Sequence, residues 1–446
     1  MKIPAWVQAA LDKKSLLGKN ILWLVVSRFG TQGLMVLFTL VLARRLGSAE
    51  FGVYALLAAV IFVGNALTTF GTDMLLIREI ASQNDRSQLL PALLIQLVLS
   101  AGFIFLVWAA APLLPNQSPA GVLGLKIYSL ALVPLAFFSV FTAVLRGKQR
   151  MELYTALNLT ASALQLAAVW VLIRPGGSIV LLAEVLFMVQ CAAALLGGIL
   201  CATQIRGFWK GWHTCWQEVI GLVRRSAPIA LIALISILYQ KISIYMISAY
   251  AGPAPTGWFS AGLRMLEAAK TVHLAVFTAL YPAMASAFAV SLGKMESVIQ
   301  VPWKGSFQQT WKLLLLGSTA ASLGLYLFAA PLIQILFGAE YAPAIGGLRI
   351  LAWIMIPFTI NTFSSLSILA HHEEQVVLRV QSAGLAALIL LNAWWIPRWG
   401  INGSCLGLVT AETAQSVLYL ARWEPVRRKT RQWAGAMIGY LSGDRT

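Results

Sequence analysis

The chain has 446 residues, of which 59% are hydrophobic and only 11% are charged, and its mean hydropathy is +0.78. A soluble domain carries about 25% charged residues, so this composition excludes an ordinary soluble enzyme and predicts an integral membrane protein. The net charge of +17 would suggest nucleic acid in a soluble protein, but in a membrane protein it is typical of lysine and arginine kept in cytoplasmic loops, and no nucleic-acid partner is expected.

Apolar segments recur along the whole chain, and each is long enough to cross a hydrocarbon core of about 30 Å at 1.5 Å per residue. The predicted spans are 19–43, 51–72, 89–112, 123–145, 153–173, 178–203, 227–250, 258–287, 309–330, 348–370, 376–396 and 401–421. This pattern predicts an all-α membrane protein of about twelve transmembrane helices in two six-helix lobes.

The division into lobes rests on the longest internal loop, which follows the sixth span. In that loop Trp209, Trp212 and Trp216 share one helical face beside basic residues, a pattern typical of a helix in the headgroup layer. The predicted regions are a cytoplasmic N-terminal lead-in at 1–18, an N-terminal lobe at 19–203, a basic Trp-rich interfacial linker at 204–226, a C-terminal lobe at 227–421 and a basic cytoplasmic tail at 422–446.

The positive charges fall mostly on one side of these spans. With the N-terminus inside, 23 of the 33 lysines and arginines lie in cytoplasmic segments, six lie at outer ends and four lie within spans. Because positive residues are retained on the cytoplasmic side, we expect both termini in the cytoplasm and the protein in the cytoplasmic (inner) membrane. Membrane lipids are expected partners, above all for the basic tail.

A weak internal repeat supports two related halves. Gly47-Ser-Ala-Glu-Phe-Gly52 and Gly252-Pro-Ala-Pro-Thr-Gly257 align at an offset of 205 residues. Pro134 lies near the middle of the fourth span and Pro357 near the middle of the tenth. Because proline bends helices, the pattern predicts interrupted helices in corresponding places, a common layout of transporters with a site between the halves.

Four cations lie inside the predicted spans: Arg28, Lys241, Arg264 and Lys270. A charged side chain in mid-membrane costs about 3 kcal/mol or more and tends to face a bundle interior or a wet cavity. Guanidinium groups match phosphate geometry, so the four residues predict a cationic cavity for an anionic or phosphate-bearing substrate. The alternative is ion pairing inside the protein, with snorkelling near span ends.

Carboxylates are fewer in the spans. Glu267 lies three residues from both Arg264 and Lys270, so we expect it to neutralise one of them in part. Asp73, Glu184 and Glu412 lie at or inside other spans, where a carboxylate can couple transport to an ion such as H+ or Na+, although a solvated cap for Asp73 and a structural hydrogen bond for the other two are the simpler interpretations.

No catalytic group, cofactor or metal is expected. The sequence has no HExxH, P-loop or GxSxG motif, and no loop is large enough for a catalytic domain. The cluster His371-His372-Glu373-Glu374 resembles a metal site, but it lies in a short predicted cytoplasmic turn and is interpreted as a solvated helix start.

The first 80 residues carry a family resemblance. The region around Lys19-Asn20 and Arg28, followed by LARRLGSAEFGVYALL and FGTDMLLIREIA, resembles the start of bacterial oligosaccharide flippases, the polysaccharide-biosynthesis or O-antigen transporter family of the multidrug/oligosaccharidyl-lipid/polysaccharide exporter superfamily. The motif match is concentrated in residues 19–81, and length and span count extend it over nearly the whole chain.

The resemblance implies a transporter, not an enzyme. It implies alternating access between two lobes that move a polyprenyl-diphosphate-linked oligosaccharide from the cytoplasmic to the outer leaflet during synthesis of O-antigen, capsule, exopolysaccharide or lipopolysaccharide. Related lipid II flippases use arginines in the first and eighth helices, where this chain has Arg28 and Arg264. They also have helices beyond twelve, so a surface-polysaccharide repeat unit fits better than lipid II. Polymerase and glycosyltransferases of the same pathway are the implied partners.

Two other functions stay open. A multidrug exporter of the same superfamily would need a carboxylate-rich cavity for cationic drugs. A membrane-embedded polysaccharide polymerase or ligase would need a large outer loop with catalytic groups.

Overall fold

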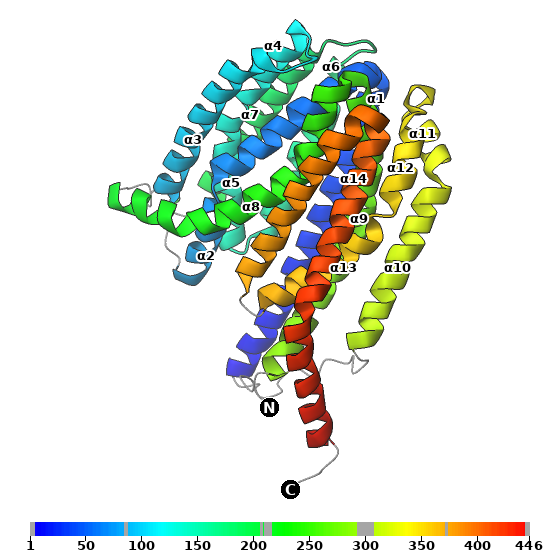
Figure 1. The fold of residues 1–446 in the computed structure, drawn as a ribbon. Helices are drawn as coiled ribbons and strands as arrows, with labels where there is room; N and C mark the ends of the chain where they lie inside the picture. The colour runs from blue at the N-terminus through cyan, green and yellow to red at the C-terminus, as the bar shows by residue number, and fades with distance from the viewer. Residues whose placement is uncertain are drawn as a thin grey trace. The chain divides into compact units, whose positions relative to one another are not determined.

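The computed structural model describes residues 5–83, 88–205, 208, 216–291, 307–370 and 373–441. Within these ranges the secondary structure is helical, without a strand, and Figure 1 shows the order of the helices. The α-helices are α1 (Ala5–Thr69), α2 (Thr72–Gln83), α3 (Leu89–Ala110), α4 (Pro119–Ser129), α5 (Leu132–Gly147), α6 (Met151–Leu172), α7 (Ile179–Gln204), α8 (Trp216–Ala251), α9 (Pro253–Ser291), α10 (Phe307–Leu327), α11 (Ala329–Leu336), α12 (Ala344–Ala352), α13 (Met355–Ala370) and α14 (Glu374–Leu441), with short 3-10 helices η1 (Ala111–Leu113) and η3 (Ala339–Tyr341).

The predicted all-α membrane fold is confirmed. Among the described residues, seven helices are long and apolar enough to cross a membrane, and two bent helix pairs bring this number up to nine. Two of the seven, Leu22–Thr69 and Glu374–Ala421, have 48 residues each. A single crossing takes about 20 residues, so each is long enough for two crossings, and all twelve predicted spans fall on helices to within a few residues at their ends.

Glycines in the left-handed region separate the paired spans. Gly47 (φ 77°) divides α1, and Gly400 (φ 54°) divides α14. Gly252 (φ 86°) separates α8 from α9. A side chain with a Cβ rarely adopts this backbone conformation, so these glycines allow one helix to follow another without a loop. Gly47 and Gly252 are equivalent positions of the predicted repeat and have the same role.

The two mid-span prolines mark helix breaks, as predicted. Pro134 is the third residue of α5, and Pro357 is the third residue of α13. Proline has no N–H to donate, and the first turn of a helix is where that N–H has no intrahelical acceptor. The break therefore lies just before each proline, between α4 and α5 and between α12 and α13, where the second pair bends by 44°.

The chain divides into two compact units, which are described separately. Unit 1 comprises Met1–Ala261 and Gln334–Ala342, and unit 2 comprises Gly262–Ile333 and Pro343–Thr446. In unit 1, α1 packs on α6 and α8, and α7 packs on α4, α5 and α6. In unit 2, α14 packs on α12 and α13, and α10 packs on the same two helices.

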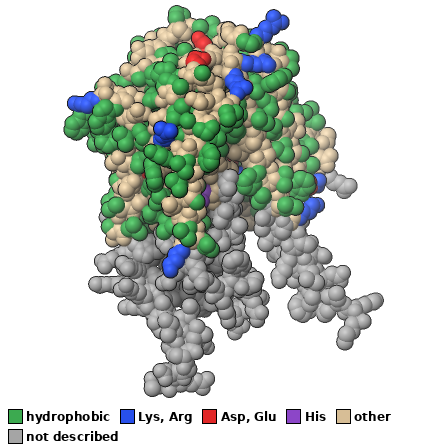
Figure 2. All heavy atoms as spheres, turned by 90° about the vertical axis from the view of Figure 1, so that its right-hand side faces the viewer, with side chains coloured by type: hydrophobic (Ala, Val, Ile, Leu, Met, Phe, Trp, Pro, Cys, Tyr) green, Lys and Arg blue, Asp and Glu red, His purple; other side chains and the backbone are tan. Residues whose placement is uncertain are grey.

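Apolar side chains occupy both the cores and much of the surface. Val140, Val144 and Leu76 are buried in the core of unit 1, whereas Val98 and Phe105 on α3 are 69% and 77% exposed. Figure 2 shows hydrophobic side chains spread over one face with few charged ones between them. Such a surface is stable against lipid and unfavourable in water, so the protein is a multi-pass membrane protein.

The predicted linker is only partly described. Trp209 and Trp212 lie outside the described residues, while Trp216 begins α8 and is 75% exposed. The second half of the predicted linker is therefore helical and continuous with the seventh span. The positions of the linker and the tail at the membrane surface, and the sidedness of the termini, stay predictions.

Candidate functional site

The four predicted cations lie two in each unit. In unit 1, Arg28 lies on the first half of α1 and its side chain is exposed. Its neighbours Leu24, Val25 and Phe29 are about equally exposed, at 39%, 40% and 41%. Within the described residues Arg28 has no ion pair or side-chain hydrogen bond. A guanidinium on an apolar helix surface in this state needs a headgroup, a wet space or a ligand.

Lys241 on α8 is stabilised differently. Its Nζ lies 5.0 Å from the centroid of the Phe62 ring on the second half of α1. A cation over an aromatic face gains about 0.5–2 kcal/mol, which offsets part of the cost of placing an ammonium in an apolar helix. Lys241 therefore has an identified contact inside unit 1.

The other two cations lie on α9 in unit 2, nearly two turns apart, with Glu267 midway between them. Arg264 Nη1 and Glu267 Oε2 are 2.9 Å apart, so the predicted partial neutralisation by Glu267 is confirmed. Lys270 Nζ lies 4.5 Å from the centroid of the Phe358 ring on α13. In unit 2, Glu267 thus partly neutralises Arg264, whereas the contact of Lys270 is an aromatic ring face.

Glu412 is buried on α14 and held by a neighbouring helix. Its Oε2 accepts a hydrogen bond of 2.6 Å from Asn361 Nδ2 on α13. Ser416, one turn along α14, donates to Asn361 Oδ1 at 2.9 Å. The sequence predicts Glu267 as the acid beside the cations, whereas it does not predict the contact of Glu412 with Asn361. The only available signal was the polar pair Glu412 and Ser416 at i, i+4 in an apolar span.

A second polar contact lies in the same unit. The Thr359 hydroxyl and His273 Nε2 are 2.8 Å apart, and both side chains are buried. Thr359 also donates to the Met355 carbonyl, one turn back on α13. The structure thus places His273 beside the first turns of α13, which the sequence alone did not indicate.

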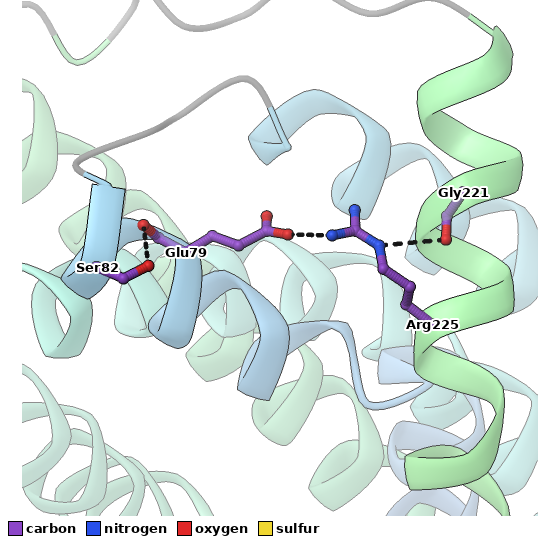
Figure 3. Close-up of polar contacts among 4 residues, drawn as sticks. All are labelled: Glu79, Ser82, Gly221 and Arg225. Carbon is purple, nitrogen blue, oxygen red and sulfur yellow. Dashed lines mark hydrogen bonds and ion pairs between the residues drawn. The ribbon is translucent and has the colours of Figure 1, made fainter.

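The remaining candidate carboxylates are apart from these clusters. Glu184 on α7 is exposed, and Asp73 lies in the first turn of α2, where a negative charge is favourable. Also in α2, Glu79 forms an ion pair with Arg225 of α8, and Arg225 also donates to the Gly221 carbonyl (Figure 3). Among the described residues no group of three potential metal ligands occurs, and His371 and His372 lie outside them.

The glycine repeat is a packing site in unit 1. A Cβ on Gly52 would lie 1.8 Å from the Pro253 carbonyl oxygen, and a Cβ on Gly257 would lie 2.1 Å from the Ser48 carbonyl oxygen. Two helix starts therefore meet backbone to backbone, which only glycine permits. The aligned residues of the predicted repeat are thus in direct contact with each other.

The 334–342 segment forms hydrogen bonds with the same region of unit 1, at residues 43–48. Glu340 Oε1 accepts a hydrogen bond of 2.7 Å from the Ser48 N–H, at the start of the second half of α1. The Ser48 side chain first, and its N–H second, hold the pKa of Glu340 below its ordinary value, because hydrogen bonds to a carboxylate favour its charged form. Tyr341 donates to the Ala43 carbonyl at 3.0 Å, and Arg44 donates to the Leu336 carbonyl at 2.8 Å.

One surface groove lies between α1 and α6 in unit 1. It has a volume of about 400 Å³ and is lined by Leu34, Leu37, Val41, Ala163, Leu166, Ala167, Trp170 and Val171. The lining is apolar, and none of the four embedded cations contributes to it. This groove is therefore not the predicted cationic cavity, and whether the cations share a cavity stays a prediction.

Comparisons with solved structures show the fold. An inward-facing multidrug resistance MATE family transporter of the MOP superfamily matches with a TM-score of 0.72 and 15% identity, over 90% of this chain and 95% of the other. The lipid II flippase MurJ, in an inward closed conformation, matches with a TM-score of 0.68 and 13% identity, over 96% and 94%. A MOP superfamily transporter from Pyrococcus furiosus, described as having a binding pocket of reverse polarity, matches with a TM-score of 0.65 and 15% identity, over 92% and 95%.

The sequence comparisons address the family. A search of curated protein sequences gave no significant match. The sequence profile described as "Polysaccharide biosynthesis protein" matches residues 17–288, which is more than half of the chain and includes Arg28, Lys241 and the α9 cations. The chain therefore belongs to the polysaccharide biosynthesis protein family and has the fold of the MOP superfamily transporters.

Proposed function

We propose that the protein is a flippase that moves a polyprenyl-diphosphate-linked oligosaccharide from the cytoplasmic to the outer leaflet of the inner membrane, by alternating access. The substrate is a repeat unit of a surface polysaccharide such as O-antigen, capsule or exopolysaccharide. Family membership and the fold support transport in polysaccharide synthesis. The cations inside the helices support a substrate that carries a diphosphate group.

The proposal depends most on the exposed side chain of Arg28. It is an exposed guanidinium on an apolar helix of a polysaccharide biosynthesis family protein. Diphosphate oxygens accept paired hydrogen bonds from a guanidinium, and a bound diphosphate would supply the counter-charge. Arg264 is the second phosphate ligand in this proposal, with Lys241 and Lys270 adding positive charge, while the lipid tail stays in the bilayer.

The test measures flipping of a lipid-linked oligosaccharide in proteoliposomes with Arg28→Ala and Arg264→Ala. We expect each variant to lower the initial rate by about tenfold or more at unchanged protein incorporation. Arg398→Ala is the matched control, because Arg398 is also an arginine in an apolar helix but donates to the Trp394 carbonyl at 2.9 Å. Unchanged rates in both test variants would contradict the cationic site.

Ion coupling is a further part of the proposal. Of the candidate carboxylates, buried Glu412 is better placed to respond to an ion than exposed Glu184 or terminal Asp73. Imposing an H+ or a Na+ gradient on the same proteoliposomes tests it. A rate that depends on neither gradient would exclude coupling to these ions.

A multidrug exporter is the second candidate, favoured by the fold match to a MATE transporter. A cationic drug needs surplus carboxylate, whereas the described embedded cations are at least as numerous as their carboxylate partners. Drug susceptibility of cells with and without the gene separates the two functions. Resistance conferred by the protein, without an effect on surface polysaccharide, would favour the exporter.

A further inference from the structure

The apolar groove between α1 and α6 ends beside a guanidinium. Leu34, Leu37 and Val41 line it from α1, and their i, i+3, i+7 spacing places them on one face of that helix. Arg45 lies one turn beyond Val41 on the same face. The Trp170 ring lines the groove from α6, and Arg45 Cζ lies 4.8 Å from the centroid of that ring. One wall of the groove is therefore in direct contact with a cation.

Small side chains open the groove on the α6 side. Ala163 and Ala167 lie four residues apart, and both are exposed, so α6 presents only methyl groups where a larger side chain would fill the space. Leu37 and Trp170 also line the groove and are 51% and 59% exposed. The groove is thus apolar and open at the surface, and in a multi-pass membrane protein such a surface meets hydrocarbon chains.

The size of the groove fits one chain within one leaflet. Its lining extends over positions 34–41 of α1 and 163–171 of α6, which is about 11–12 Å at 1.5 Å per residue. The hydrocarbon core is about 30 Å thick, so one leaflet is roughly half of that. A groove of this length and of about 400 Å³ takes one acyl chain of a phospholipid, whereas a polyprenyl chain is too long to be contained in it.

The end of α6 fixes Arg45 beside the groove. Arg45 Nη1 donates to the carbonyls of Trp170 and Ile173, and the Arg45 carbonyl accepts from the Gly176 N–H at 2.8 Å. Arg174 lies in the same turn and is exposed. Among the described residues neither arginine pairs with a carboxylate, and Arg45 Nε and Nη2 donate no hydrogen bond. These N–H groups can therefore bind a phosphate.

This end of the groove has the features of a membrane–water interface. Tryptophan is enriched at that level, and Trp170 is exposed there. Both helices end within a few residues, α6 at Leu172 and the first half of α1 at the Gly47 break. Arg45 thus lies at the level of lipid headgroups, and the groove runs from it into the hydrocarbon core. The predicted topology assigns this interface to the outer leaflet.

We propose that the groove and Arg45 form a binding site for an anionic phospholipid, with one acyl chain between α1 and α6 and the headgroup phosphate on the guanidinium groups of Arg45 and Arg174. The inference goes beyond the proposed function, because none of the four embedded cations lines this groove. A zwitterionic phospholipid has the same chains and phosphate, but its own cation competes with the arginines. The site therefore selects lipids by the net charge of the headgroup.

The experiment measures lipid binding to the purified, delipidated full-length protein in detergent by native mass spectrometry. The probes are dioleoyl phosphatidylglycerol and dioleoyl phosphatidylcholine, which have the same chains and differ in headgroup charge. We expect the wild type to bind phosphatidylglycerol about tenfold more tightly. Arg45→Gln should weaken binding of phosphatidylglycerol about tenfold and leave binding of phosphatidylcholine nearly unchanged.

A second variant tests the groove itself. Ala167→Phe fills the space with a ring, so it should weaken binding of both lipids about tenfold, because the acyl chain loses its apolar contacts. Ala101→Phe is the matched control, since Ala101 is an exposed alanine of α3 that does not line the groove. We expect this control to bind both lipids as the wild type does.

A third variant covers the case in which Arg45→Gln does not fold, since Arg45 also binds the α6 carbonyls. Arg174→Gln removes an exposed guanidinium and should weaken binding of phosphatidylglycerol about fivefold. Arg398→Gln is its matched control. Arg398 also lies over a tryptophan, with Cζ 5.1 Å from the centroid of the Trp394 ring, but neither residue lines the groove.

The outcomes decide between occupants. Selective binding of phosphatidylglycerol that either arginine variant weakens, with loss of binding in Ala167→Phe, upholds the phospholipid site. Equal binding of the two lipids by the wild type, selectivity unchanged in both arginine variants, or unchanged binding by Ala167→Phe overturns it. Displacement of phosphatidylglycerol by undecaprenyl phosphate, which in turn fails to bind Ala167→Phe, would assign the groove to a polyprenyl chain and would equally overturn the proposal.

Discussion

Unit 1 and unit 2 both carry polar groups inside apolar helices, and they stabilise them by different means. Unit 1 uses the backbone: Gly52 and Gly257 bring two helix starts into contact, and Arg44 and Glu340 pair with backbone carbonyl and N–H groups. Unit 2 uses side chains, with Glu412 and Asn361 at the centre of a network.

The difference shows that an embedded charge must be interpreted from the groups beside it. Arg264 has the Glu267 carboxylate at 2.9 Å, and Lys270 lies over the Phe358 ring, so each has a stabilising contact inside unit 2. Arg28 has no such neighbour among the described residues and is the stronger indicator of an external anion. The same residue type in the same kind of helix therefore differs in meaning according to what packs beside it.

The largest effect is expected from the backbone contact of unit 1. Gly52→Val places carbon atoms where the Pro253 carbonyl lies, and we expect a loss of stability of more than about 4 kcal/mol, seen as loss of folded protein in size-exclusion chromatography. Gly102→Ala is the control, because nothing lies within 4 Å of its added Cβ and alanine favours the helix by roughly 0.5–1 kcal/mol. Normal folding of Gly52→Val would disprove the contact.

Loss of the side-chain network of unit 2 should destabilise the protein less than loss of the glycine contact in unit 1. Asn361→Ala removes both hydrogen bonds that Asn361 Nδ2 donates to Glu412, and we expect a loss of about 1–3 kcal/mol, because interhelical hydrogen bonds in membranes are modest and leaving a carboxylate unsatisfied adds to the cost. Thermal unfolding in detergent measures this loss of stability. Thr413→Ala is the matched control, because Thr413 is exposed and its hydroxyl donates only to the Val409 carbonyl of its own helix. A loss as large as that of Gly52→Val would remove the contrast between the units.

A surface ion pair should contribute less to stability than either the glycine contact of unit 1 or the side-chain network of unit 2. Arg225 is half exposed and pairs with Glu79 across α2 and α8 (Figure 3). Exposed pairs contribute about 0–1 kcal/mol, so Arg225→Gln should lower the free energy of unfolding by less than about 1 kcal/mol, and added salt should reduce the difference. A larger loss that salt does not affect would indicate that the pair organises α2.

The smallest effect is expected at Glu340, and it should depend on pH. The pKa of Glu340 is lowered by the Ser48 side chain and then by the Ser48 N–H, so its stabilisation is present above the pKa of the unfolded chain, near 4.5, and is lost as the pH falls through the folded pKa. We expect Glu340→Gln to lower Tm by about 2 °C or less at pH 7, with the difference vanishing in acid. A difference that persists there would show that charge is not its cause.

Local sequence features predicted much of the fold. Apolar length placed the twelve spans, Gly47 and the prolines at 134 and 357 marked breaks, and the 205-residue repeat marked equivalent helix starts. These features depend on hydrophobicity and on allowed backbone angles, which neighbours along the chain determine. The pair Arg264 and Glu267 was equally accessible, because residues at i, i+3 on one helix are neighbours.

The sequence by itself thus determined a multi-pass helical protein with cations inside its spans, because hydrophobic length and helical spacing are local properties. Only the tertiary structure decided which groups the embedded and buried carboxylates contact: Asn361 and Glu412 are 51 positions apart in the chain, and Ser48 and Glu340 are 292 apart. Contacts across such separations depend on how helices pack, and helix packing depends on the shapes of many side chains at once, which no local pattern encodes.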